Sequence, residues 1–125
     1  MWEIGVDIVE VQRFNELDYP NHRNFYERTF TPQEIDYCLS FKQPAQHFAA
    51  TFAGKEAVYK ALSRHVNVKL REIEIVRNGG VPEVRLLTNE NVNLEETVRR
   101  PEIKVSLSHT SSYAVAFALA VFKEP

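Results

Sequence analysis

The chain has 125 residues, and its 15 lysines and arginines against 17 aspartates and glutamates give a formal net charge of −2. This balance argues against electrostatic binding of nucleic acid or of an anionic membrane surface. Hydrophobic residues make up 44% of the chain, as in ordinary globular proteins, so the length predicts one domain over residues 1–125. The single cysteine, Cys38, excludes an internal disulfide framework. No apolar run approaches the roughly 20 residues of a membrane span, and we expect a cytoplasmic protein.

Alternating apolar residues predict a strand at the start of the chain, with one face formed by Trp2, Ile4, Val6 and Ile8. Asp7 lies on the other, less apolar face. Short helical segments are predicted near residues 11–14 and 25–28. The sequence Thr31-Pro32-Gln33-Glu34 contains an N-cap residue, a first-turn proline and the glutamate of a capping box, which predicts a helix over about 32–39.

An uninterrupted helical pattern runs from Pro44 to about Arg64. One stripe of this predicted helix carries the large residues Phe48, Phe52, Tyr59 and Leu62. A second stripe places Glu56 and Lys60 one turn apart among alanines. Because alanine side chains are small, this stripe allows another element of the structure to approach closely.

The residue pattern in the second half of the chain predicts β-strands. Strands at 73–77 and 84–87 flank the turn Asn78-Gly79-Gly80, and two more strands are predicted at 103–108 and 113–122. Residues 89–100 fit either a short helix or an irregular loop. In the last strand, large residues at odd positions alternate with alanines at 114, 116, 118 and 120. We interpret the large face as core and the alanine face as packed against a helix or a second subunit, within an α+β fold of antiparallel hairpins and one long helix.

Three polar groups interrupt this pattern: Asp7 in an apolar strand, Glu56 with Lys55 and Lys60 on the long helix, and His109 after an apolar strand face. Each has a plain structural alternative, as an edge residue, a surface ion pair or a turn histidine. Carboxylates on two separate elements suit Mg²⁺, which commonly binds one or two protein carboxylates together with substrate phosphate. Lys60 would neutralise a phosphate oxygen, and His109 would contact a phosphate or transfer a proton. The set indicates metal-assisted phosphoryl-type transfer.

Four segments together resemble the holo-acyl-carrier-protein synthases, which are small 4'-phosphopantetheinyl transferases. In chain order they are Gly5 to Phe14, Glu27 to Glu34, Phe52 to Leu62 and Ser106 to Thr110. Gly80-Val81-Pro82 is also similar to the turn that precedes a strand in this family. The resemblance covers nearly the whole chain and implies the family's α+β fold, an antiparallel sheet with one long central helix and shorter helices.

The resemblance implies transfer of the phosphopantetheine arm of coenzyme A to a serine of an apo acyl carrier protein, with Mg²⁺ as cofactor and adenosine 3',5'-bisphosphate as the second product. Asp7 and Glu56 would bind Mg²⁺ and act with Lys60 and His109 in catalysis. Either Glu56 or a metal-held water would accept the serine proton. The same resemblance implies further residue roles. Coenzyme A would be contacted by Lys60, Pro82, His109 and Arg64, the carrier protein would dock on Arg13 and Arg28, and the chain would form a homotrimer with its sites between subunits.

The sequence also departs from the family pattern. Thr51 and Gly54 stand where the family commonly has arginine and alanine, and Ser63-Arg64-His65 replaces a Gly-Thr-Gly stretch. Arg64 offers a compensating positive charge. Two alternatives therefore stay open beside the transferase: a catalytically inert trimeric module that binds carrier protein or coenzyme A, and a metal-dependent nucleotide hydrolase.

Overall fold

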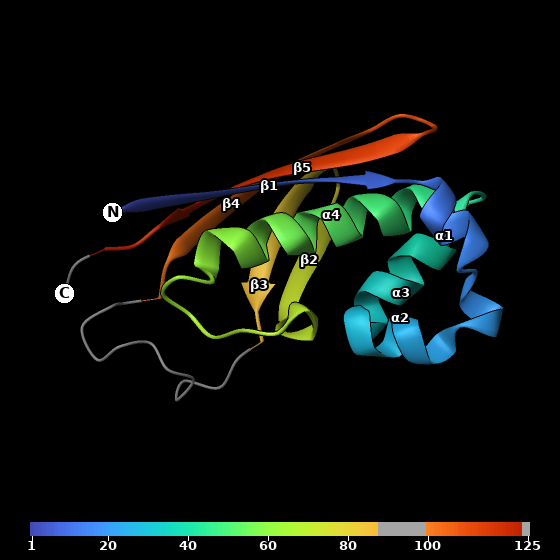
Figure 1. Cartoon of the computed structure of the whole chain (residues 1–125), viewed down its shortest axis with the longest axis horizontal. Helices are drawn as coiled ribbons and strands as arrows, with labels where there is room; N and C mark the ends of the chain where they lie inside the picture. The colour runs from blue at the N-terminus through green and yellow to red at the C-terminus, as the bar shows by residue number, and fades with distance from the viewer. Residues whose placement is uncertain (88–99, 124–125) are drawn as a thin grey trace.

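A long helix, α4 (Pro44–Leu62), lies across an antiparallel sheet in the computed structural model of the chain, which describes residues 1–87 and 100–123 (Figure 1). Of the segment predicted as a helix or loop at 89–100, only Arg100 is among the described residues. The remaining elements are, in order, β1 (Trp2–Glu10), α1 (Gln12–Glu16), α2 (Arg23–Thr29), α3 (Pro32–Leu39), β2 (Ile73–Asn78), β3 (Val81–Leu86), β4 (Glu102–His109) and β5 (Tyr113–Val121), with 3₁₀ turns at Tyr19–Asn21 and Leu70–Glu72.

The strands form two sheets. Three of them pair in the order β1-β5-β4, and β2 pairs with β3 in a separate antiparallel hairpin. The helices α1, α2 and α3 gather at the N-terminal end of α4 (Figure 1). Near its other end Met1 and Phe122 lie side by side, because the Phe122 N–H donates to the Met1 carbonyl. The predicted α+β class and long central helix are confirmed. No helix among the described residues has the length and apolarity needed to cross a membrane.

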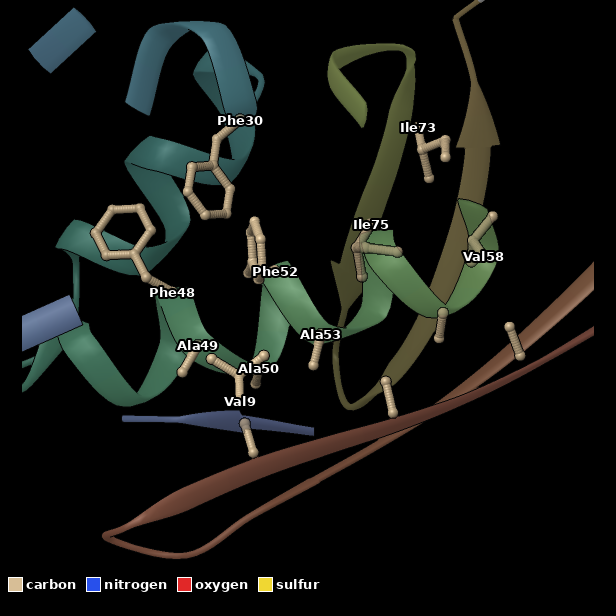
Figure 2. Close-up of a cluster of buried hydrophobic side chains, with 14 of the residues drawn as sticks. Val9, Phe30, Phe48, Ala49, Ala50, Phe52, Ala53, Val58, Ile73 and Ile75 are labelled. Atoms are coloured by element: carbon tan, nitrogen blue, oxygen red, sulfur yellow. The ribbon is translucent and has the colours of Figure 1, made fainter. Parts of the chain in front are cut away.

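The helix α4 is buried on most of its circumference because it lies between the three-stranded sheet and the other elements. Figure 2 shows Phe48 and Phe52 on one side of α4, grouped with Phe30, and Ala49 and Ala53 on the side that faces β1. Pro44 occupies the first turn, as predicted. The capping box of α3 is also confirmed, because Thr31 accepts from the Glu34 N–H and Glu34 accepts from the Thr31 N–H.

The two faces of the β1-β5-β4 sheet differ in a way that the sequence analysis did not anticipate. The alanines of β5, at positions 114, 116, 118 and 120, are completely buried beneath α4. The large residues on the opposite face are exposed, with Phe117 at 47% and Tyr113 at 49%. The interpretation of the large face as core is therefore wrong for the single chain. A helix packed on one side of the sheet needs small residues beneath it, and no described element covers the other side.

Two glycines allow the close packing of α4. A Cβ atom on Gly5 would lie 1.9 Å from the carbonyl oxygen of Ala57, so only glycine lets β1 lie this close to the helix. A Cβ on Gly54 would lie 3.0 Å from the end of the Leu107 side chain and 3.4 Å from Ile75. The approach at Gly5 places Asp7, two residues further on the same strand face, beside α4.

Lys55 does not belong with Glu56 and Lys60, contrary to the cluster proposed from sequence. Its side chain is fully buried, and its ammonium donates to Glu34 at 2.6 Å and to the Ile73 carbonyl at 2.5 Å. The other Glu34 oxygen accepts from the Ile75 N–H at 2.8 Å. Burial raises the pKa of Glu34 and lowers that of Lys55, and their attraction opposes both shifts. This buried pair satisfies backbone groups of β2 and joins α3 and α4 to it.

Candidate functional site

The carboxylate site forms where β1 crosses the C-terminal half of α4. Asp7 comes from β1, and Glu56 and Lys60 lie one turn apart on the helix. The Lys60 ammonium donates to Asp7 Oδ1 at 3.1 Å and to the Val6 carbonyl at 3.0 Å. Lys60 thus pairs with a residue more than fifty positions away and not with Glu56, so the alternative of a simple surface ion pair along the helix does not describe it. The Lys60 side chain is half exposed and remains open to solvent.

Glu56 experiences two opposing electrostatic influences. Partial burial, followed by the nearby Asp7 carboxylate, raises its pKa, while the positive charges of Lys60 and Arg13 lower it. Arg13, on α1, lies with its guanidinium 5.2 Å from the centroid of the Phe52 ring, one helical turn before Glu56. The structure therefore brings Asp7, Glu56, Lys60 and Arg13 into one neighbourhood, as the sequence analysis expected of the first three.

The donor set at this site is compatible with Mg²⁺. The Asp7 carboxylate lies near enough to Glu56 to help raise the pKa of Glu56, after the larger effect of burial, and a divalent cation between two carboxylates relieves such repulsion. Within residues 1–87 and 100–123, no group of three or more histidine, cysteine, aspartate or glutamate side chains has metal-binding geometry. Magnesium needs fewer protein ligands than that, because water and substrate phosphate complete its coordination shell. Asp7 and Glu56 are the residues that would hold it.

His109 lies on a different strand from Asp7. Asp7 is on β1 and His109 ends β4, so the two residues stand on opposite edges of the sheet. The His109 ring lies 5.7 Å, edge to face, from the ring of His47 on the first turn of α4. His47 and Lys60 are 13 residues apart along the helix, which corresponds to about 20 Å. One strand, β5, separates the strand of His109 from that of Asp7, and the ring contact given for His109 is with His47 at the N-terminal end of α4.

Pro82 lies on the β2-β3 hairpin, opposite a residue whose charge acts on His47. It stands opposite Arg77 in the β2-β3 ladder, so both residues share one face of the hairpin. The Arg77 guanidinium lies over the Tyr37 ring at 4.7 Å, and its charge, together with His109, lowers the pKa of His47 below its usual value, after the larger effect of burial. Sequence reasoning did not identify His47 or Arg77. They lie 30 residues apart, and no local motif joins them.

The remaining predicted site residues occupy other surfaces. Arg64, just beyond α4, lies 3.8 Å from Glu3 on β1 and is strongly exposed. His65 contacts the same carboxylate at 3.2 Å. Arg28, on α2, donates to the Asn24 carbonyl and lines a cleft of about 420 Å³ with Arg71. Thr51 stands where the family commonly has arginine. Its side chain is buried and donates to the His47 carbonyl.

The chain is an α+β protein. Its site combines two carboxylates and a lysine at the crossing of β1 and α4, which is a set of residues that suits metal-assisted phosphate chemistry. A model of the 4'-phosphopantetheinyl transferase superfamily matches residues 3–118. The chain belongs to this superfamily, and it is therefore a member of an enzyme family of transferases.

Relatives and solved structures agree with this assignment. A holo-[acyl-carrier-protein] synthase of Moorella thermoacetica is 43% identical over 121 residues, which cover 95% of this chain and 93% of the relative. The same domain matches part of the fatty acid synthase subunit alpha of Candida parapsilosis, at 40% identity over 95% of this chain and 6% of that much longer protein. The Chronobacterium ammoniagenes ACPS-CoA complex superposes with a TM-score of 0.81 at 27% identity and covers 98% of both chains.

Proposed function

We propose that this protein is a holo-acyl-carrier-protein synthase that transfers 4'-phosphopantetheine from coenzyme A to a serine of an apo acyl carrier protein. The observation that carries the proposal is the meeting of Asp7, Glu56 and Lys60 at the crossing of β1 and α4, in a member of this transferase superfamily. The names of the relatives supply the two substrates. In the reaction, the serine oxygen bonds to the phosphorus of the pantetheine phosphate, the pyrophosphate bond breaks, and adenosine 3',5'-bisphosphate leaves.

Each residue of the site has a separate role in this reaction. Asp7 and Glu56 would hold Mg²⁺, which when bound supplies positive charge against the charge that develops on the leaving bisphosphate. Lys60 is half exposed and its ammonium moves from Asp7 to a phosphate oxygen. Glu56, whose pKa is raised by burial, or a water that it holds, accepts the serine proton.

The exposed face of the three-stranded sheet supports a homotrimer with active sites between subunits. Ile4, Val6 and Ile8 of β1 are 64%, 56% and 66% exposed, and the β1-β5 register places Val6 beside Phe117. A continuous apolar face of this kind is typical of a surface that binds another protein. Sedimentation velocity on the wild type and on a Val6→Lys variant tests this assembly, and a wild-type monomer would contradict it.

Arg13 is the stronger candidate for carrier-protein docking, because it lies at the carboxylate site while Arg28 lies over α2. We predict that Arg13→Ala raises the KM for carrier protein about tenfold and leaves the KM for coenzyme A nearly unchanged. Arg28→Ala serves as the matched comparison and should have the smaller effect. Equal changes in both KM values for Arg13→Ala would contradict a docking role.

Intact-mass spectrometry tests the reaction itself. An apo acyl carrier protein is incubated with this protein, coenzyme A and Mg²⁺, with and without EDTA. We expect the carrier mass to rise by one phosphopantetheinyl group only in the absence of EDTA. Binding without a mass shift would indicate an inert module, and cleavage of coenzyme A at the same rate without carrier protein would indicate a hydrolase.

A further inference from the structure

Strand β1 is attached to the C-terminal half of α4 by charged side chains at two places. Asp7 accepts from the Lys60 ammonium at 3.1 Å. Glu3, four residues earlier on the same face of the strand, lies 3.2 Å from Nε2 of His65, three residues beyond the end of α4. The two contacts stand about 13 Å apart along the strand. Gly5, which has no room for a side chain, lies between them, so β1 is held on both sides of this glycine.

The Glu3–His65 pair is the more sheltered of the two attachments. The side chains of Glu3 and His65 are 21% and 20% exposed, whereas that of Lys60 is 50% exposed. The His65 ring also packs against the Phe122 ring, with centroids 4.8 Å apart. Phe122 is buried, its N–H donates to the Met1 carbonyl at 2.9 Å, and its carbonyl accepts from the Met1 ammonium at 3.1 Å. His65 is therefore oriented by a residue that is anchored to the start of the chain.

The contact between these two side chains is a hydrogen bond that the imidazole donates. An ionised Glu3 carboxylate only accepts, so the Nε2–H of His65 is the donor, both in the protonated ring and in the neutral Nε2–H tautomer. Arg64 lies 3.8 Å from the same Glu3 oxygen, but its side chain is strongly exposed, and such a pair contributes little. His65 is therefore the firmer partner of Glu3, although the proposed reaction gives it no role.

The second attachment matters when the first one opens. In the proposed transfer the Lys60 ammonium leaves Asp7 for a substrate phosphate, while Asp7 has to stay near Glu56 if both are to hold one metal ion. In the described part of the chain, the polar side-chain contacts of β1 with this region that then remain are those of Glu3. We propose that Glu3 and His65 are positioning residues, which keep β1 on α4 while Lys60 binds the substrate. The Lys60 step rests on the proposed function, whereas the double attachment rests on the contacts alone.

Amide hydrogen exchange of the β1 segment, followed by mass spectrometry on the whole protein without substrate, tests the double attachment. His65→Phe keeps a ring against Phe122 and removes the donor to Glu3, and Lys60→Met opens the other attachment as the substrate does. Because each contact holds the strand when the other is absent, we expect β1 in the double variant to exchange at least about threefold faster than in Lys60→Met alone. His65→Phe alone should have a smaller effect.

The Mg²⁺ requirement of transfer separates positioning from a purely structural role. His65→Phe should raise the Mg²⁺ concentration for half-maximal rate about fivefold and change the rate at saturating Mg²⁺ less than about twofold. Loss of folded protein would instead lower the saturated rate without moving that concentration. His65→Gln, whose amide can donate to Glu3, should restore part of the effect. His22→Phe is the matched control, because it removes a histidine that contacts a different carboxylate, Asp18, and should match the wild type in both measurements.

The proposal is overturned if the double variant exchanges β1 no faster than Lys60→Met. It is also overturned if exchange depends on His65 but the Mg²⁺ requirement does not, because the contact is then structural only. Either result leaves the proposed transferase standing if the carrier protein still gains its mass. Conversely, a wild type that transfers nothing loses the transferase assignment and with it the positioning role, while the exchange measurement still shows whether the Glu3–His65 pair attaches β1.

Discussion

Two lysines of α4, five residues apart, show how one helix carries both a structural and a chemical ion pair. Lys55 is completely buried, and its ammonium is held by Glu34 and a β2 carbonyl. Lys60 is half exposed and pairs with Asp7, which is itself only partly buried. The first pair has no room to change partners, whereas the second faces solvent and can exchange its partner for a substrate phosphate.

This difference teaches that burial, more than the residue types, separates the two roles. A buried ion pair is costly to break because the remaining charge has no water to replace its partner. A half-exposed pair contributes little to stability because water competes with it. Chemistry is therefore expected on the Lys60 side of the helix and structural integrity on the Lys55 side.

The largest effect should come from the carboxylates beside Lys60. We predict that Glu56→Gln and Asp7→Asn each reduce transfer to below about one thousandth of the wild-type rate, since each removes a ligand and a charge at the site. The free energy of unfolding should change by less than about 1 kcal/mol. Initial rates of carrier modification and urea denaturation measure the two quantities. Near-normal transfer in either variant would refute the role of the carboxylates.

The second effect concerns stability at Lys55. Lys55→Met leaves the Glu34 carboxylate buried without its partner, and we expect a loss of about 3–5 kcal/mol in the free energy of unfolding. Lys60→Met is the matched control and should cost less than about 1 kcal/mol. The double variant Lys55→Met with Glu34→Met should be more stable than Lys55→Met alone, because it removes the unpaired charge. Equal losses at Lys55 and Lys60 would contradict the comparison.

The third effect tests the strand approach that brings Asp7 to Lys60. Gly5→Ala puts a methyl group into the Ala57 carbonyl, so β1 has to move away from α4, at a cost of about 3 kcal/mol and with reduced transfer. In Gly54→Ala the methyl meets the ends of the Leu107 and Ile75 side chains and no backbone atom within 4 Å outside its own helix, while helix propensity improves, so a change within about 1 kcal/mol is expected. Similar losses in the free energy of unfolding for Gly5→Ala and Gly54→Ala would contradict the close approach of β1 to α4 at Gly5.

The smallest effect is a pH dependence of stability without metal. Because the folded protein raises the pKa of Glu56 above 4.5, its protonated form is favoured in the native state. The resulting stabilisation is present below the unfolded pKa and is lost as the pH rises through the folded value. Urea denaturation in EDTA should therefore show the wild type losing stability relative to Glu56→Gln as the pH rises above about 4.5. A constant difference between the two proteins would contradict the raised pKa.

Much of the local structure follows from patterns within short segments. The capping box at Thr31 and Glu34, the first-turn proline of α4 and the glycine turn before β3 were each predicted, because these signals act through neighbouring residues. The face of Asp7 was also predicted, because strand alternation places it opposite the apolar residues of β1. The sequence alone also connected Asp7 with Glu56, through their residue types and their surroundings.

Other features depended on residues far apart in the chain. The partner of Lys55 is Glu34, 21 residues away, and nothing in the local sequence distinguishes Lys55 from Lys60. His47, Arg77 and His109 come from three elements far apart in the chain, so no common motif joins them. The large face of β5 has the same alternation as a core strand, and only the position of α4 on the other face shows that it is exposed.

The sequence by itself determined the class of fold, the helix and strand boundaries to within a few residues, and the family. Periodicity and capping depend on local contacts, and the family motifs depend on residue identity. The tertiary structure decided which lysine pairs with which carboxylate, which sheet face remains exposed, and that the His109 ring lies beside the His47 ring. Those outcomes follow from close packing and burial, which are properties of segments brought together by folding.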